Sequence, residues 1–182
     1  RILNAIKSAI PAKDFPNVVF VGLGSICGGS GSEVLPALNE AVVKLGGFMT
    51  NVVSMPENDS NKAMANTGNA FRNFLERSRN IGQPIPVSFA GGPGMPRTQA
   101  NQQAFKEIMS VVTLIRELGK RTITGVDLRD VFNAFIEKAP GQSAGIRLIR
   151  FTTQPVNEAL KGCATGIGIT ATANPLEMNV SG

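Results

Sequence analysis

The fold is decided by the stretch Asn17-Val18-Val19-Phe20-Val21-Gly22-Leu23-Gly24-Ser25-Ile26-Cys27-Gly28-Gly29-Ser30-Gly31-Ser32-Glu33. It opens with a continuous run of β-branched and aromatic residues, which is typical of a strand buried on both faces in a parallel sheet. The run breaks into glycines, and a helical pattern follows up to Gly46-Gly47. Residues 48–54 predict a second buried strand. Together these elements form one βαβ unit, for which we expect a right-handed crossover.

The rest of the chain predicts further helices and strands around this unit. Helical spacing is found over residues 1–10, 61–78 and 98–118, while strands are expected over 84–90, 145–151 and 166–173. The third strand should begin near Pro86, because proline belongs at the start of a strand. The helix over 98–118 is apolar on most sides, so we expect it to be buried along much of its length and to end at Gly119. We therefore predict an α/β fold with a Rossmann-like parallel sheet and a long central helix in residues 1–119, and the start of a smaller α+β domain in residues 120–182.

Composition excludes several classes of function. The chain has no histidine, which rules out Ser-His-Asp catalysis, His-Cys catalysis and the common zinc sites. Its two cysteines lie far apart in the sequence and form no disulfide framework, which favours a reducing cytoplasm. No apolar run reaches the roughly eighteen residues that a membrane span needs. The net charge of +5 is spread along the chain and aromatic residues make up only 5%, a pattern that disfavours nucleic acid as a direct ligand.

A buried strand that leads through glycines into a helix is a phosphate-binding geometry. Glycines let a ligand approach the backbone closely, and the amides at a helix start favour an anion. The candidate ligand-binding residues are Gly24, Gly28, Gly29, Ser30, Gly31 and Ser32, with the two hydroxyls as additional donors. The loop has no lysine after its glycines, so it is not a Walker-type phosphate loop, and its spacing does not match a dinucleotide fingerprint. The alternative is a tight turn whose glycines serve only packing.

The order of these features resembles the family of tubulin and FtsZ. In that family a buried strand leads into a glycine loop of the form G-G-G-T-G-[ST]-G, and residues 28–33 read G-G-S-G-S-E here. The resemblance implies that the loop binds the phosphates of GTP or GDP together with Mg²⁺. It also implies that Glu57 and Asn58, after the second strand, lie near the ribose. Asn101, in the first turns of the long helix, would contact the guanine base, although it could equally be an ordinary polar residue of that helix.

A pair of carboxylates follows the long helix. The segment Thr124-Gly125-Val126-Asp127-Leu128-Arg129-Asp130-Val131 resembles the family's N-x-D-x-x-D loop, with glycine in place of asparagine. The resemblance implies that Asp127 and Asp130 are catalytic and polarise a water over the GTP of a neighbouring subunit. The alternative from the residues alone is that Asp127 caps a helix and Asp130 completes a capping pair.

The resemblance as a whole implies a GTP-hydrolysing cytoskeletal protein that polymerises head to tail, of a divergent prokaryotic or phage type. The family's first strands would precede residue 1, so we expect the chain to be part of a longer protein. Two other hypotheses stay open: a Rossmann-like module or enzyme for another phosphate-bearing ligand, and a non-catalytic structural protein.

Overall fold

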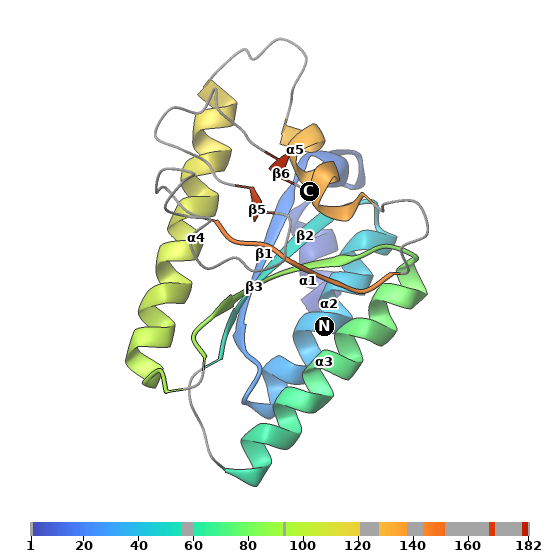
Figure 1. Ribbon diagram of the computed structural model, residues 1–182. Coiled ribbons are helices and arrows are strands. Elements are labelled where there is room, and N and C mark those ends of the chain that lie inside the picture. The colour runs from blue at the N-terminus through green and yellow to red at the C-terminus, as the bar shows by residue number, and fades with distance from the viewer. Residues whose placement is uncertain are drawn as a thin grey trace.

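The computed structural model describes residues 2–55, 60–92, 94–120, 128–137, 144–151, 168–169 and 180–181. Its centre is a four-stranded parallel sheet whose strands lie side by side in chain order: β1 (Val19–Ser25), β2 (Phe48–Ser54), β3 (Ile85–Ala90) and β4 (Ile146–Leu148) (Figure 1). β1 and β2 pair along their full length, from Val19 opposite Phe48 to Ser25 opposite Ser54. The prediction of an α/β fold built on a parallel sheet is confirmed.

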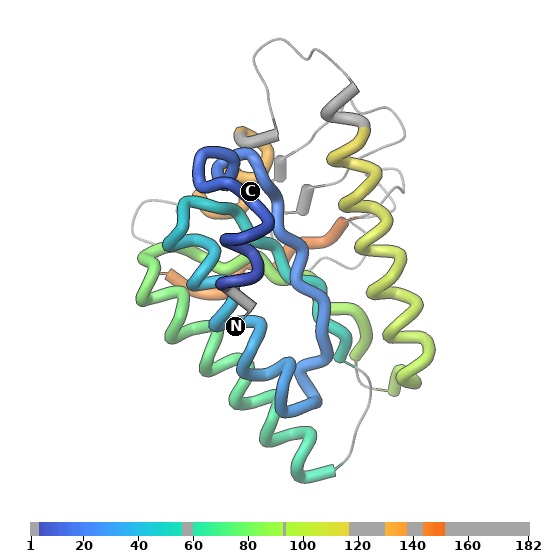
Figure 2. Tube along the Cα trace, turned by 180° about the vertical axis from the view of Figure 1, so that it is seen from behind, coloured from blue at the N-terminus to red at the C-terminus, as the bar shows by residue number. Residues whose placement is uncertain are grey.

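Helices cover both faces of this sheet. They are α1 (Ile2–Ala9), the 3₁₀ helix η1 (Ala12–Asn17), α2 (Gly29–Lys44), α3 (Asn61–Ile81), α4 (Arg97–Lys120) and α5 (Leu128–Ile136). α2 and α3 pack side by side on one face, while α4 and α5 lie on the other (Figures 1 and 2). The connection from β3 to β4 therefore crosses the face opposite to the first two connections, and its hand is opposite to theirs. Two further short strands, β5 (Gly168–Ile169) and β6 (Val180–Ser181), pair antiparallel in a separate sheet.

β2 shows why the apolar runs produce this layering. Successive side chains of a strand point to opposite faces of the sheet. Met49 and Val53 are buried in the cluster that includes residues of α2 and α3, whereas Val52 is buried against α4 beside Ala90 and Ala104. A strand that is buried on both faces needs apolar residues at consecutive positions, which is the pattern that predicted it.

Several element boundaries differ from the sequence-based expectation. β1 continues to Ser25, and α2 begins at Gly29 rather than after Glu33, because the glycines let α2 pack directly on the end of β1. α3 extends to Ile81, where Gly82 ends it in the left-handed conformation with φ of 68°. Pro86 is the second residue of β3.

The long helix α4 also departs from expectation. It continues through Gly119 to Lys120, and one face of it is exposed: Phe105 is 63% exposed, and Met109 and Val112 are 46% exposed. The expectation of burial was wrong for this face. The helix crosses β2 and β3 with its other side, where Ala104 and Val111 are buried.

The strand expected over residues 145–151 does not begin a separate sheet. β4 pairs with β3 in the central sheet, from Ile85 opposite Ile146 to Val87 opposite Leu148. α5 packs on the same sheet through Val131, Phe132 and Phe135. The division of the chain at residues 119 and 120 stays a prediction.

Candidate functional site

The carboxyl ends of β1, β2 and β3 define one edge of the sheet, and each strand leads from there into a helix start. The first residues of α2, α3 and α4 follow at Gly29, Asn61 and Arg97 (Figure 1). Because the strands are parallel, all three helix starts lie at the same edge, where ligands bind in open α/β sheets. The positive ends of three helix dipoles at one edge favour an anionic ligand.

The glycine loop presents open backbone amides at this edge. Gly28 precedes the first turn of α2, and it has no side chain with which to cap the helix. Within the described residues, no backbone carbonyl accepts a hydrogen bond from the amides of Gly29, Ser30 or Gly31. Gly28, Gly29 and Ser30 are exposed, and a Cβ atom built on Gly29 meets no atom within 4 Å. These amides are the orphan donors of a helix start, and there is open space beside Gly29.

Two glycines of the candidate set serve packing instead. A Cβ atom on Gly31 would overlap the carbonyl oxygen of Ser25 and would lie 2.9 Å from its carbonyl carbon. A Cβ atom on Gly24 would lie 2.8 Å from Cδ1 of Leu35. The packing alternative therefore applies to the side-chain positions of Gly24 and Gly31, although the amide of Gly31 still belongs to the helix start.

The two serines of the loop have different surroundings. Ser32 is buried, and its hydroxyl donates to the carbonyl oxygen of Gly29 at 2.7 Å. That hydroxyl therefore bonds within α2 and does not face the edge of the sheet. Ser30 is exposed.

Helix α3 holds the glycine loop through two asparagines that the sequence analysis missed. Nδ2 of Asn66 donates to the carbonyl oxygen of Cys27 at 3.0 Å, and Nδ2 of Asn73 donates to the carbonyl oxygen of Ser32 at 3.1 Å. The two asparagines are seven residues apart and so share one face of the helix. This spacing can be read from the sequence. Only the packing of α3 against α2 shows that both side chains reach the glycine loop.

The ends of β2 and β3 are tied to the start of α4. The hydroxyl of Ser54, the last residue of β2, donates to Oδ1 of Asn101 at 2.9 Å. The amide of Met55 donates to the carbonyl oxygen of Ala90 at 2.8 Å. Gly91 has φ of 108°, and a Cβ atom there would lie 2.5 Å from the carbonyl oxygen of Met55, so only glycine fits. Asn101 is therefore held at the edge with its side chain exposed.

The remaining predicted residues of this edge are only partly described. Glu57 and Asn58 lie outside the described residues. Two cations that were not predicted accompany the helix starts: Lys62 in the first turn of α3 and Arg97 at the start of α4, both exposed. Glu33 is exposed on α2 beyond its first turn. Cations beside amides at helix starts add to the positive potential of the edge.

Asp130 lies at the opposite edge of the sheet. It is exposed in the first turn of α5, and Asp127 is outside the described residues. α5 packs on the amino ends of β1 and β2, where the rings of Phe132 and Phe48 have centroids 4.6 Å apart. A cavity of about 460 Å³ lies there, lined by residues of both strand starts and of α5, among them Val19, Phe48 and Phe132. A strand of this length spans roughly 20 Å, so the fold separates Asp130 from the glycine loop of its own chain.

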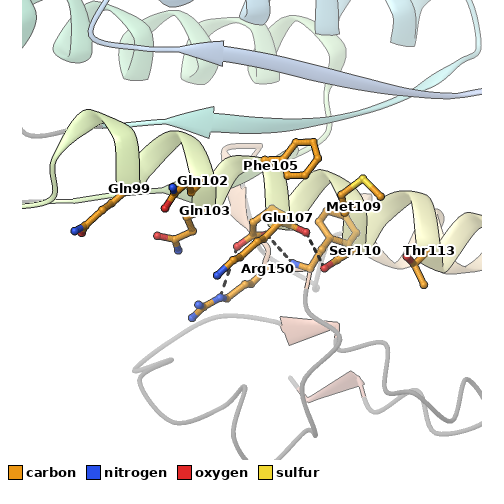
Figure 3. Close-up of a pocket in the computed structure, with 11 residues that line it drawn as sticks. Gln99, Gln102, Gln103, Phe105, Glu107, Met109, Ser110, Thr113 and Arg150 are labelled. Atoms are coloured by element: carbon orange, nitrogen blue, oxygen red, sulfur yellow. Dashed lines mark hydrogen bonds and ion pairs between the residues drawn. The ribbon is translucent and has the colours of Figure 1, made fainter.

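A buried carboxylate on α4 forms a separate polar cluster (Figure 3). Oε2 of Glu107 accepts hydrogen bonds from the hydroxyl of Ser88 at 2.8 Å and from the amide of Phe151 at 3.0 Å. Nε of Arg150 lies 3.6 Å from Oε1. Burial raises the pKa of Glu107, against the opposing effect of these three partners. The cluster joins α4 to β3 and to the residues that follow β4, and it lines a cavity of about 620 Å³ on the side of α4.

Comparisons with known protein families, with curated proteins and with solved structures find no match to this chain. In the part of the chain that the structure describes, no helix combines the length and the apolar character that crossing a membrane requires.

Proposed function

We propose that this chain belongs to a GTP-binding protein of the tubulin and FtsZ type that polymerises head to tail and hydrolyses GTP between subunits. The observation that carries the proposal is the placement of the two predicted motifs at opposite edges of one sheet. The glycine loop follows the carboxyl end of β1, and Asp130 lies on α5 at the amino ends of the strands. Two half-sites at opposite ends of a molecule can combine only between subunits, and repeating such a contact generates an open filament.

The glycine edge would bind the nucleotide. The amides of residues 28–31, the starts of three helices, and the cations of Lys62 and Arg97 suit a polyphosphate. Asn101 would contact the base, with its amide held by the hydroxyl of Ser54. The space in front of Gly29 is consistent with a phosphate approaching the backbone. Mg²⁺ bound with the nucleotide would neutralise phosphate charge.

The carboxylate edge would complete the reaction for the neighbouring subunit. Asp130, with Asp127 before it, would orient the attacking water and accept its proton. Because one edge would bind GTP and the other would complete its hydrolysis, a mutation at the carboxylate edge should affect turnover without affecting assembly. Replacing Asp130 by Ala should leave GTP-dependent light scattering intact and abolish phosphate release from the full-length protein.

The matched control is Glu137→Ala, which removes another exposed carboxylate next to the end of α5. It should keep both assembly and turnover. Phosphate release by the Asp130→Ala variant at the rate of the unmodified protein would overturn the catalytic role.

A second function rests on the same edge without Asp130. Open amides at a helix start fit other phosphate-bearing ligands, as in Rossmann-like modules and enzymes. A thermal-shift comparison of GTP, ATP and NAD at equal concentration separates the two, because a ligand that binds the folded protein raises its melting temperature, and a tighter ligand raises it more. Selective stabilisation by GTP supports the first proposal. Stabilisation by none of the three supports a structural protein with an ordinary glycine turn.

A further inference from the structure

The hydrogen bond between Asn66 and the glycine loop fixes the direction of one peptide unit. Nδ2 of Asn66, on α3, donates to the carbonyl oxygen of Cys27 at 3.0 Å. The side chain of Thr67 reaches the same residue, with its hydroxyl oxygen 3.7 Å from Sγ of Cys27. Asn66 is half-buried between α3 and the loop, so the bond is partly shielded from water.

The peptide bond between Cys27 and Gly28 is planar and trans, so its carbonyl and its N–H point in opposite directions. Because Asn66 draws the carbonyl of Cys27 toward α3, the N–H of Gly28 points away from α3. Gly28 is exposed, and no backbone acceptor for its amide is found within the described residues. The orientation of this amide therefore depends on a side chain from another helix, 39 residues away in the sequence.

We propose that Asn66 is a positioning residue of the phosphate site, which holds the glycine loop so that the amide of Gly28 faces the ligand. The inference rests on the proposed nucleotide binding at this edge and deepens it by naming the group that orients one of its donors. Asn66 itself does not touch the ligand. It acts by fixing a carbonyl on the far side of the loop, which keeps the donor on the near side in place before binding.

Asn73 provides a matched comparison on the same helix. Its Nδ2 donates to the carbonyl oxygen of Ser32 at 3.1 Å, so it makes the same kind of bond between α3 and α2. The N–H that shares a peptide unit with this carbonyl belongs to Glu33, which lies past the first turn and bonds within the helix. Loss of Asn73 should therefore weaken packing without changing a donor of the site.

The test measures GTP, pyrophosphate and guanosine affinities by isothermal titration for the full chain and for the variants Asn66→Ala and Asn73→Ala. Losing one hydrogen bond to a charged group corresponds to about tenfold in affinity. We expect Asn66→Ala to weaken GTP and pyrophosphate binding about tenfold and to leave guanosine, which has no phosphate, unchanged. Asn73→Ala should lower the melting temperature about as much as Asn66→Ala does, because each variant loses one hydrogen bond between α3 and the segment of residues 27–32. It should keep all affinities within about twofold.

Asn66→Asp keeps the volume of the side chain but removes the donor and brings a carboxylate against the carbonyl of Cys27, so it should lose at least as much affinity. Asn66→Asp also replaces Asn66→Ala in the binding test if the alanine variant does not fold. Unchanged pyrophosphate affinity in both variants, or equal losses for Asn66→Ala and Asn73→Ala, would overturn the positioning role while leaving nucleotide binding intact. A protein that binds neither GTP nor pyrophosphate would instead overturn the proposed function on which the inference rests.

Discussion

Replacing Gly31 by Ala should destabilise the protein, because the start of α2 packs closely on the end of β1. The added Cβ atom would overlap the carbonyl oxygen of Ser25 and would lie 2.9 Å from its carbon and 3.3 Å from its nitrogen. All three are backbone atoms at the end of β1, so no flexible side chain can move aside. Such overpacking costs about 1–3 kcal/mol.

The matched control is Gly29→Ala in the same helical turn. A Cβ atom there meets nothing within 4 Å, so the substitution should be neutral or should stabilise the protein by up to about 1 kcal/mol through helix propensity. The same propensity gain acts at position 31. The difference in free energy of unfolding between the two variants is therefore the steric cost alone, about 1–3 kcal/mol.

Urea denaturation followed by far-UV circular dichroism measures this difference. The midpoints should shift in opposite directions, or the Gly31→Ala midpoint should fall while the other stays constant, with equal slopes. In a chain of this length, 1 kcal/mol also corresponds to about 2–4 °C in melting temperature. Equal stability of the two variants would refute the close packing of α2 on the end of β1, and with it the placement of the loop amides.

Three further predictions concern buried polar groups. Burial raises the pKa of Glu107 above 4.5, so folding favours its protonated form and stability falls as pH rises through the raised value. Glu107→Gln should reduce the fall of the urea midpoint with rising pH, and an unchanged dependence of the midpoint on pH would contradict this. A hydrogen bond from Lys44, reinforced by one from Arg77, lowers the pKa of Glu40, so its contribution is present above 4.5 and is lost as pH falls. Glu40→Gln should therefore shift the urea midpoint down more at neutral than at acidic pH, and equal shifts at both would contradict a stabilising role of these ion pairs. Ser54→Ala should cost about 1 kcal/mol of unfolding free energy and weaken GTP binding, and unchanged binding would separate the bond to Asn101 from the site.

The sequence by itself determined the strands, the helices and the glycine edge. Residues 48–54 and 84–90 carry consecutive apolar residues, a local pattern that predicts burial on two faces, and β2 and β3 follow these ranges closely. The end of α3 was not set by the apolar pattern but by Gly82, which adopts the left-handed conformation. Such signals are local, because each depends on neighbours within about four residues.

Tertiary structure decided what each residue of the edge does. Gly31 faces the backbone of β1, Ser32 turns its hydroxyl into α2, and Asn66 reaches the loop from α3. The exposed face of α4 and the place of α5 at the amino ends of the strands were likewise set by how the helices cross the sheet. Contacts between residues about forty positions apart depend on the distance and angle between packed elements, and no local periodicity encodes these.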